Sequence, residues 1–407
     1  MVINMANVMD YIEWRGDLPF SVCPLCEVDN LIFCLLSYVD LDGIVPASPK
    51  EGRVTVRQAA MEYFFDLDPD EERPLGLIMP TAILDLFRRM ARAPRYRDLE
   101  LTGYVNEVSE EREMQFSALT VRLPDEQVFV AFRGTDDTIV GWREDFNLSY
   151  MDEIPSQRKA VRYLDALDIT PESRLYVGGH SKGGNLAVWS VIHADESLRH
   201  RIVRVFSNDG PGFSEELIAS EAYGRMADRI TCLLPDDSLV GLLLENDGQY
   251  EVVKSHKKGL FQHDGLTWEV MGGQFVRSEG LSPRGTHNDT VVRDRIRAMT
   301  REEKRDLTHL FFGVLESTGA KTLTELNDGK VKAVLAALRT WGELEKGTKE
   351  TALYLVGKLF DIKVLGAPPR PPQENERASE PEKTPPPLSR KPPRPRVRVE
   401  WFPWLAR

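Results

Sequence analysis

The residues with the clearest chemical potential form Gly179-x-Ser181-x-Gly183, which lies between an apolar segment ending at Val177 and a segment of helical pattern that begins at Gly184. A buried strand followed by a helix is the setting in which this spacing presents a serine hydroxyl at the tip of a tight turn. Small residues on either side of the serine let the strand and the helix approach closely. The helix N-terminus also stabilises negative charge nearby. Ser181 is therefore the predicted nucleophile of an acyl-transfer reaction.

A serine nucleophile needs a general base, which in strand-turn-helix sites of this kind follows the serine and an acid in chain order. Two downstream histidines, His256 and His263, lie just after the apolar segment Tyr250–Val253. His256 is followed by two lysines, which are typical of a solvated loop and lower the pKa of a histidine. His263 lies between Phe261 and Trp268, in a drier setting. We therefore expect His263 to be the base.

The acid that orients the imidazole has two candidates. Asp209 follows the segment VRVFSN, and Asp237 follows ITCLL. Each would lie at the carboxyl end of a strand, where open α/β sheets bind their ligands. Each also has a purely structural interpretation, since aspartate often begins turns and caps helices. We prefer Asp237, and Asp209 stays open.

An oxyanion hole requires two backbone donors near the nucleophile. One is the N–H of the residue after the serine, here Lys182, and the other comes from the loop after an earlier strand. That loop is Arg133–Asp137, directly after the apolar run QVFVAF. Its Thr135 offers both an N–H and a hydroxyl. The predicted oxyanion donors are therefore Thr135 and Lys182.

The elements that must position these residues alternate between strand and helix. The strands are short and rich in valine, isoleucine and phenylalanine, which is typical of strands covered on both faces. Alternation of this kind predicts an α/β fold with a mostly parallel central sheet and helices on both faces. We expect strands at Leu99–Val108, Met114–Leu123, Gln127–Phe132, Arg174–Val177, Ile202–Phe206, Ile230–Leu234 and Tyr250–Val253, and helices at Gln157–Leu167 and Gly184–His193.

The chain divides by composition into a domain over residues 1–365 and a tail over 366–407. Within the domain, residues 1–95 have helical patterning, 98–275 form the α/β core, and 288–360 return to helix. The tail is dominated by proline with arginine and lysine between, so no packed core can form from it. We expect it to be disordered. It is also a possible docking segment for a protein partner.

Bulk composition excludes several function classes. The 407 residues carry a net charge of -12, which gives no electrostatic reason to expect nucleic-acid binding. No apolar stretch is long enough for a transmembrane helix, and the N-terminus lacks a signal-peptide pattern. The four cysteines are too few for a disulfide scaffold, and Cys23-x-x-Cys26 lacks further ligands for a metal. We expect a cytoplasmic protein without a metal or cofactor.

Three segments resemble those of class 3, fungal-type lipases. These are Val130–Thr135, Gly141–Phe146 and Gly179–Ala187, where the lipases read roughly AFRGT, NW-x-x-D and GHS-x-GG-x-L-A. The N-terminal DYIEWRGDLPF and the later NDGPGF, SLVG and QHD are more similar to an uncharacterised bacterial group of lipase-like α/β-hydrolases. The resemblance implies the α/β-hydrolase fold, with helical additions at both ends of the core.

The resemblance also implies roles for individual residues. Ser181 would be the nucleophile and His263 the base, with Thr135 and Lys182 as oxyanion donors. Asp237 would occupy the acid position, because its Asp-Ser-Leu-Val is similar to the lipases' Asp-Ile-Val-Pro. The implied reaction is hydrolysis of a small acyl ester or lipid through an acyl-enzyme. An acyltransferase, or an inactive binding or scaffold protein that works through its proline-rich tail, remain as alternatives.

The sequence departs from the lipase pattern in three ways that bear on mechanism. Lys182 stands where those lipases have leucine, and Gly241 stands where they have proline. No apolar lid follows Thr135, because the next residues are Asp136 and Asp137. Activation at a lipid surface is therefore not expected.

Overall fold

The computed structural model describes residues 5–65, 75, 80–245, 248–283, 286 and 299–328. The chain divides into two compact units, residues 1–366 and 367–407. The second unit lies outside the described residues. The tail expected to be disordered, residues 366–407, lies outside them as well. Of the helical region expected over 288–360, only residues 299–328 are described.

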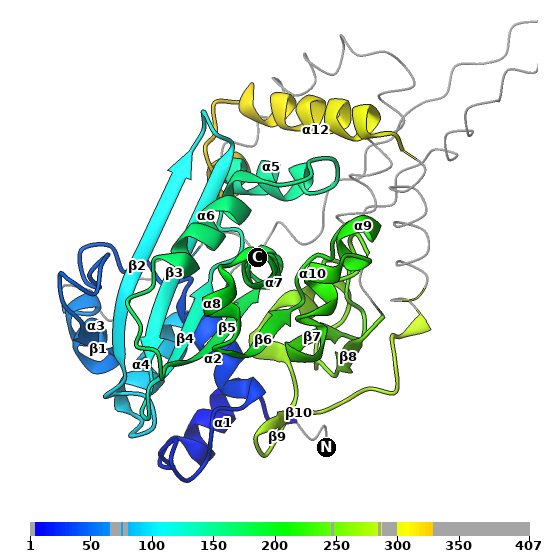
Figure 1. The fold of residues 1–407 in the computed structure, drawn as a ribbon. Helices are drawn as coiled ribbons and strands as arrows, with labels where there is room; N and C mark the ends of the chain where they lie inside the picture. The colour runs from blue at the N-terminus through cyan, green and yellow to red at the C-terminus, as the bar shows by residue number, and fades with distance from the viewer. Residues whose placement is uncertain are drawn as a thin grey trace, which may run out of the picture. The chain divides into compact units, whose positions relative to one another are not determined.

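An eight-stranded mixed sheet forms the centre of the first unit (Figure 1). The strands follow one another across the sheet in chain order. The first four are joined by antiparallel pairings, and β4 to β8 run parallel to one another. The strand bounds are β1 (Val54–Thr55), β2 (Glu100–Ser109), β3 (Met114–Arg122), β4 (Gln127–Phe132), β5 (Arg174–His180), β6 (Ile202–Asn208), β7 (Ile230–Pro235) and β8 (Tyr250–Val253).

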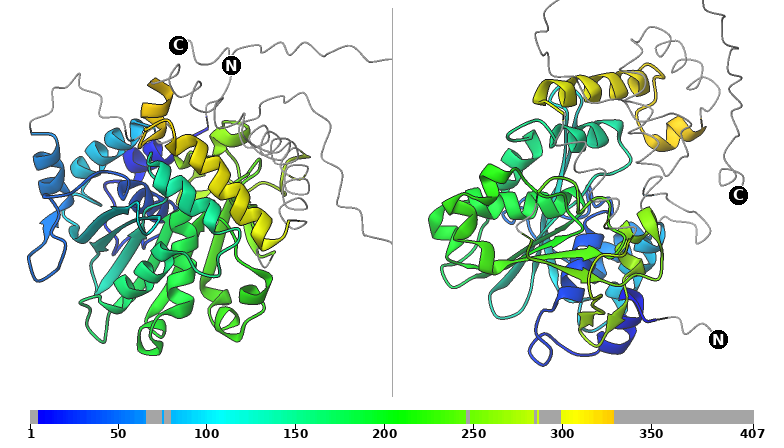
Figure 2. Two further views of the ribbon diagram at one scale, coloured as in Figure 1. Left: turned by 90° about the horizontal axis from the view of Figure 1, so that it is seen from above. Right: turned by 90° about the vertical axis from the view of Figure 1, so that its right-hand side faces the viewer.

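Each face of the sheet carries its own apolar core, as the continuous apolar strands predict. The side chains of β4 alternate between the two: Phe129 and Ala131 join one cluster, and Val128, Val130 and Phe132 join the other. The first cluster is built mainly from the N-terminal helices and the second from helices that follow β4. Figure 2 shows these two sets of helices on opposite sides of the sheet.

The N-terminal helices are α1 (Val8–Arg15), α2 (Glu27–Leu36), α3 (Val56–Tyr63) and α4 (Ala82–Arg92). The helices of the core are α5 (Ile139–Asn147), α6 (Pro155–Asp165), α7 (Lys182–His193), α8 (Glu196–Arg199), α9 (Glu215–Ile218) and α10 (Glu221–Gly224), with short 3-10 turns η1 (Ala227–Arg229), η2 (Gly259–His263) and η3 (Gly265–Thr267). A small hairpin of β9 (Val270–Met271) and β10 (Gln274–Phe275) follows, and then α12 (Arg301–Glu316) and α13 (Leu323–Asp328).

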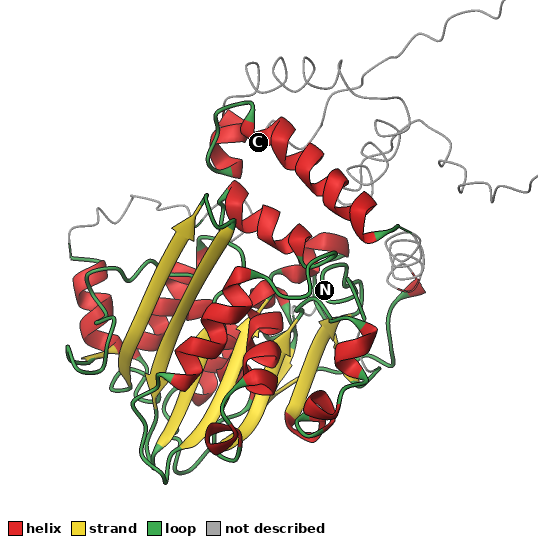
Figure 3. Cartoon of the chain, turned by 45° about the horizontal axis from the view of Figure 1, so that its top comes forward, coloured by secondary structure: helices red, strands yellow, loops and turns green. Residues whose placement is uncertain are grey.

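Helix α12 packs alongside α5 (Figure 3). The sequence patterning did not predict α5. Phe146 of α5 stacks on Phe311 with ring centroids 5.6 Å apart, and Arg143 pairs with Glu316 at 2.6 Å. The two acidic residues after Thr135 have different partners. The Asp137 carboxylate accepts the N–H of Thr324 at the start of α13, whereas the Asp136 carboxylate accepts the N–H of Thr138 just before α5. The segment after β4 is therefore held against the C-terminal helices.

The fold is an α/β-hydrolase fold, as expected. Its features are the order of strands in the sheet, the parallel strands β4 to β8 and the strand-turn-helix at Ser181. Observed strand ends agree with the predicted ones to within a few residues, and β5 and β6 extend further, up to the residues next to Ser181 and Asp209. Among the described residues, no helix combines the length and the apolar character needed to cross a bilayer.

Candidate functional site

The turn between β5 and α7 holds Ser181 in an uncommon backbone conformation. β5 ends at His180, α7 begins at Lys182, and Ser181 between them has φ +58° and ψ -133°. Non-glycine residues rarely adopt positive φ, because the Cβ atom crowds the backbone. Conformations of this kind persist only where the surrounding structure enforces them, and they concentrate at functional sites.

Two glycines make this turn possible. A Cβ atom on Gly179 would lie 2.0 Å from the backbone of Gly183, so strand and helix touch where the turn closes. A Cβ atom on Gly183 would lie 2.1 Å from the carbonyl oxygen of Phe132 on the neighbouring strand. The spacing that identified the motif therefore reflects two backbone contacts that leave no room for a side chain.

Gly183→Ala is expected to destabilise the protein by about 1–3 kcal/mol or more, because the clash is with the backbone of a central strand that cannot move aside. The measurement is the free energy of unfolding in urea. Gly224→Ala at the end of α10 is the matched control, since a Cβ atom added there would meet no atom within 4 Å. We expect the control to change stability by less than about 0.5 kcal/mol. Equal effects of the two substitutions would contradict this account of the turn.

The register of the parallel strands brings Ser181 and Asp209 to the same level at the carboxyl edge of the sheet. His180 pairs with Asn208 across β5 and β6, so the next residue of each strand leaves the sheet at the same point. The N–H of Ser181 donates to the carbonyl oxygen of Asn208 at 3.0 Å. Ligands of open α/β sheets bind at this edge.

His263 is paired with Asp209. The Nδ1 of His263 lies 2.6 Å from Oδ2 of Asp209, whose side chain is almost fully buried. The other carboxylate oxygen, Oδ1, accepts the hydroxyl of Ser238 and the N–H of Gly241, the latter at 3.1 Å. A carboxylate held by two other donors favours the imidazole tautomer with hydrogen on Nδ1. Nε2 of His263 is then free to accept a proton.

Asp237, the residue preferred on sequence, does not contact the imidazole. Its Oδ2 accepts the N–H of Gly259, its Oδ1 accepts the Ser282 hydroxyl, and its own N–H donates to Oε1 of Gln262. Asp237 follows β7, whereas Asp209 follows β6, the direct neighbour of the strand that carries Ser181. The geometry therefore assigns the imidazole partner to Asp209, and Asp237 organises the loop that carries His263.

The loop that carries His263 contacts the nucleophile turn at His180, a residue to which the sequence analysis gave no role. Nε2 of His180 lies 2.7 Å from the carbonyl oxygen of His263, and the two imidazole rings are 4.6 Å apart. Because a carbonyl oxygen can only accept, Nε2 of His180 carries the hydrogen, and Nδ1 accepts the Tyr38 hydroxyl at 3.1 Å. Burial, with a further contribution from His263, lowers the pKa of His180 to about 3, so this ring stays neutral.

Of the two aromatic residues expected to keep water away from His263, only Trp268 is buried. Trp268 is fully buried and its indole N–H donates to the carbonyl oxygen of Gln262 at 2.8 Å. Phe261 is 76% exposed, so its part in the expectation was wrong. His256 is exposed and has no such packing. Trp268 therefore fixes the backbone next to His263.

The loop after β4 approaches the nucleophile closely at Gly134, where a Cβ atom would lie 3.0 Å from that of Ser181 and 2.5 Å from the carbonyl oxygen of His180. The next residue, Thr135, is buried and donates its hydroxyl to Oδ2 of Asp145 at 2.5 Å. Thr135 therefore follows directly after the point of contact with the turn. This is the position required of the second oxyanion donor.

Lys182 has a side chain with no exposed surface. Its Nζ donates to the carbonyl oxygen of Gln115 at 2.9 Å, to Oε1 of the same residue at 2.8 Å, and to Oε2 of Glu144 at 2.9 Å. Glu144 is equally buried and also accepts the N–H groups of Gln115 and Ser156. The residue that departs from the lipase leucine thus forms a buried ion pair beneath the turn.

Asp145, beside Glu144 on α5, is half-buried and has incomplete hydrogen bonding. Its Oδ1 is buried and has no hydrogen-bond partner among the described residues. Burial raises the pKa of Asp145 to about 6, against the opposing effects of Lys182 and of the Thr135 hydroxyl. This carboxyl group therefore changes charge in the range where many hydrolases work.

Asp145→Asn is expected to remove a pH dependence of stability. Because folding raises the pKa of Asp145, the folded state binds its proton more tightly than the unfolded chain, and stability falls as pH rises through about 4 to 6. The asparagine variant keeps an acceptor for Thr135 and lacks this ionisation. Relative to it, the wild type should lose up to roughly 3 kcal/mol of unfolding free energy across that range. Urea denaturation of both proteins at a series of pH values measures this, and a difference that does not vary with pH would contradict it.

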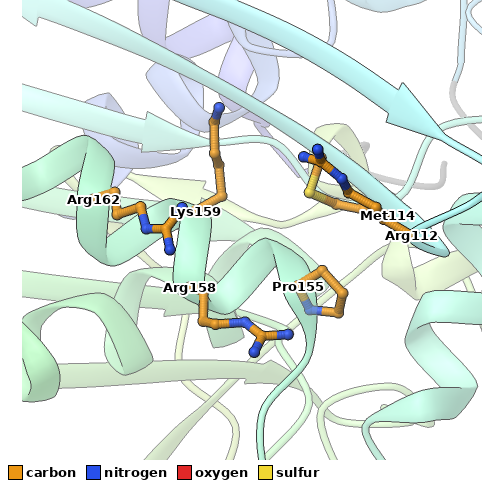
Figure 4. Close-up of a pocket in the computed structure, with 6 residues that line it drawn as sticks. All are labelled: Arg112, Met114, Pro155, Arg158, Lys159 and Arg162. Atoms are coloured by element: carbon orange, nitrogen blue, oxygen red, sulfur yellow. The ribbon is translucent and has the colours of Figure 1, made fainter.

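A surface hollow of about 360 Å³ is lined by the start of β3 and by α6 (Figure 4). Cationic side chains dominate its lining, but Arg158 and Lys159 are paired with Glu153 and Glu107. None of the predicted site residues contributes to it. The lining residues are Arg112, Met114, Pro155, Arg158, Lys159 and Arg162.

No group of three or more His, Cys, Asp or Glu side chains in the described part of the chain is arranged to hold a metal ion. The four cysteines are free thiols, and the Cys26 thiol contacts the Tyr11 hydroxyl at 3.3 Å. The carboxyl edge of the sheet presents a serine hydroxyl, an imidazole and carboxylates.

Comparisons with known proteins give one family match and several solved structures of low identity. The sequence model of the Mbeg1-like family matches residues 90–313, more than half of the chain. No curated protein matches. Similar solved structures include the M37 lipase, which is 16% identical with a TM-score of 0.33 over 52% of this chain and 68% of that one. The Rhizomucor miehei lipase propeptide complex is 13% identical, with a TM-score of 0.30 over 39% and 57%. The Lip2 lipase from Yarrowia lipolytica is 13% identical, with a TM-score of 0.27 over 49% and 76%.

Proposed function

The chain belongs to the Mbeg1-like family, and we propose that it is a serine hydrolase that cleaves carboxylic esters through Ser181, His263 and Asp209. The observation that carries the proposal is the 2.6 Å contact between His263 and Asp209. It occurs at the sheet edge where Ser181 is held at a positive φ. A buried carboxylate, an imidazole and a serine hydroxyl are the groups that acyl transfer requires.

In the proposed reaction, Nε2 of His263 takes the proton of the Ser181 hydroxyl as Oγ attacks the acyl carbonyl carbon. Asp209 holds the imidazole in the tautomer that can accept this proton and stabilises the imidazolium that forms. The backbone N–H groups of Thr135 and Lys182 donate to the tetrahedral oxyanion. The imidazolium then protonates the departing alcohol. Water, deprotonated by His263, releases the acid from Ser181 in the same way.

The contact between His180 and the carbonyl oxygen of His263 supports this assignment, because it joins the residue before the nucleophile to the residue that supplies the base. The neutral His180 ring can make this contact over a wide pH range. Ser181 is 8% exposed and the side chain of His263 is 11% exposed. Both therefore retain surface that a small acyl group can reach.

A fluorophosphonate probe tests the proposal directly. Its phosphorus bonds to an activated serine Oγ with loss of fluoride, so a protein with this function should take up one probe per chain. Mass spectrometry of the digested protein should place the adduct on the peptide that contains Ser181, and the Ser181→Ala variant should not react. An unlabelled wild type would favour the alternative of an inactive binding protein, and an adduct elsewhere would overturn the choice of nucleophile.

A further inference from the structure

We propose that the buried side chain of Lys182 is a positioning residue of the oxyanion hole, which holds α5 against the nucleophile turn and offsets the negative charge of Glu144 and Asp145 where the oxyanion forms. This inference rests on the proposed function. It concerns the ammonium group, whereas the backbone N–H of the same residue was treated above as an oxyanion donor.

The position of the ammonium is fixed from three elements. Nζ of Lys182, on α7, reaches Gln115 on β3 and Glu144 on α5 within 2.9 Å. The other oxygen of Glu144 accepts the N–H of Ser156 at the start of α6. The next residue of α5, Asp145, accepts the hydroxyl of Thr135. The ion pair therefore ties the Thr135 loop, through α5, to the helix that begins at the nucleophile.

The balance of charge behind the oxyanion hole depends on this one ammonium. Glu144 and Asp145 are consecutive carboxyl groups, and Oδ1 of Asp145 has no hydrogen-bond partner among the described residues. The charged and titratable groups that face Asp145 are Lys182, Glu144, His263 and Tyr38. Of these, Lys182 is the one whose ammonium group pairs with a carboxylate, Glu144, at 2.9 Å. A negative charge that develops nearby is stabilised less when uncompensated carboxylates lie behind it.

Structural stability alone is a poor reason for this arrangement. Burying an ammonium and a carboxylate carries a desolvation penalty that their attraction often fails to exceed, and apolar residues of similar volume are frequently as stable. Lys182 and Glu144 have no exposed side-chain surface. A buried charge placed on the residue next to the nucleophile is better explained by its effect on the charge that forms there.

Four variants separate this role from a structural one: Lys182→Gln, Lys182→Met, Glu144→Gln and the double variant Lys182→Gln with Glu144→Gln. Glutamine at 182 keeps a hydrogen-bond donor without the charge, and methionine removes both. Turnover of p-nitrophenyl acetate is measured per active site, with active sites counted by fluorophosphonate uptake. Any loss of folded protein is thereby separated from a loss of rate.

Lys182→Gln is expected to lower kcat by about 10- to 100-fold with little change in KM, because a charge near the oxyanion acts on the transition state. The double variant, which restores the local charge balance, should recover most of this loss. The ionisation midpoint of Asp145, followed by the carbon chemical shift of its carboxyl group, should rise in Lys182→Gln and fall in Glu144→Gln. Opposite shifts would show that both charges act on Asp145, and the loss of kcat in Lys182→Gln with its recovery in the double variant would show that they act on the reaction.

The proposal is overturned if Lys182→Gln turns over at the wild-type rate per active site, or if the double variant is as impaired as the single one. It is also overturned if the Asp145 midpoint moves in the same direction in Lys182→Gln and Glu144→Gln. If the lysine variants fail to fold, Glu144→Gln still tests the charge effect: its kcat per active site should not fall, because a carboxylate behind the oxyanion has been neutralised, and a large fall would overturn the proposal. A wild type that neither reacts with the probe nor hydrolyses the ester would instead refute the proposed function, which is a different result from either of these.

Discussion

Ser181→Ala is expected to lower kcat for ester hydrolysis by roughly 10⁵-fold or more, to the level that the oxyanion donors and substrate binding supply by themselves. Alanine has no hydroxyl oxygen that can form the acyl-enzyme. The backbone conformation that the turn requires at this position is the same for both residues. Hydrolysis of p-nitrophenyl esters of graded chain length by wild type and variant measures the effect. The same series shows which acyl length the wild type prefers.

Two further variants serve as the control for this prediction. One is the single variant His263→Ala, and the other is the double variant that combines Ser181→Ala with His263→Ala. A nucleophile and its base act as one unit, so removing both should cost little more than removing either. Strictly additive losses would show that the two residues act independently. A Ser181→Ala variant with substantial activity would place the chemistry at another residue.

Asp209→Asn is expected to lower kcat by about 10⁴-fold, because an amide facing Nδ1 of His263 favours the wrong imidazole tautomer and cannot stabilise the imidazolium. Asp237→Asn is the matched comparison. Asp237 accepts hydrogen bonds from Gly259 and Ser282, and asparagine retains an acceptor for one of them. We expect Asp237→Asn to keep kcat within about tenfold of wild type and to act mainly by loosening the loop that carries His263.

The two aspartates can be compared in one experiment, the pH profile of kcat/KM for wild type and both variants. A large loss in Asp237→Asn together with near-normal turnover in Asp209→Asn would show that the acid was assigned to the wrong residue. Comparable large losses of kcat/KM in both variants would mean that the hydrogen bonds made by Asp237 matter as much for the function of the His263 imidazole as the direct contact with Asp209.

Sequence reasoning was most successful where the physical constraint is local. Strands such as β4 are continuous apolar runs because both faces of the sheet are covered. The bounds of β2 to β8 were predicted to within a few residues, whereas the two-residue β1 was not predicted. Helix α5 was missed because most of the residues it buries, Gly141, Glu144 and Asn147, are not apolar, and because its packing partner, α12, is more than a hundred residues away. Local patterning carries no information about a partner that distant.

The nucleophile turn belongs to the first kind. Gly179, Ser181 and Gly183 follow one another within a single turn, and the close backbone contacts at the two glycines are dictated by that spacing. The order of residues was therefore enough to predict the strand, the turn and the helix that follows it. It also singled out His263 among the downstream histidines, although the reason depended on Trp268 and not on Phe261.

The packed fold was needed to show which carboxylate faces the imidazole and what the departures from the lipase pattern do. Asp209 and Asp237 both follow strands, and only the order of strands and their register show that Asp209 leaves the sheet beside Ser181. Likewise, a lysine after the serine gives no sign in the sequence that its ammonium is buried against Glu144. The cause is the same in both cases: these contacts join segments tens of residues apart, and their geometry arises only when the strands pair.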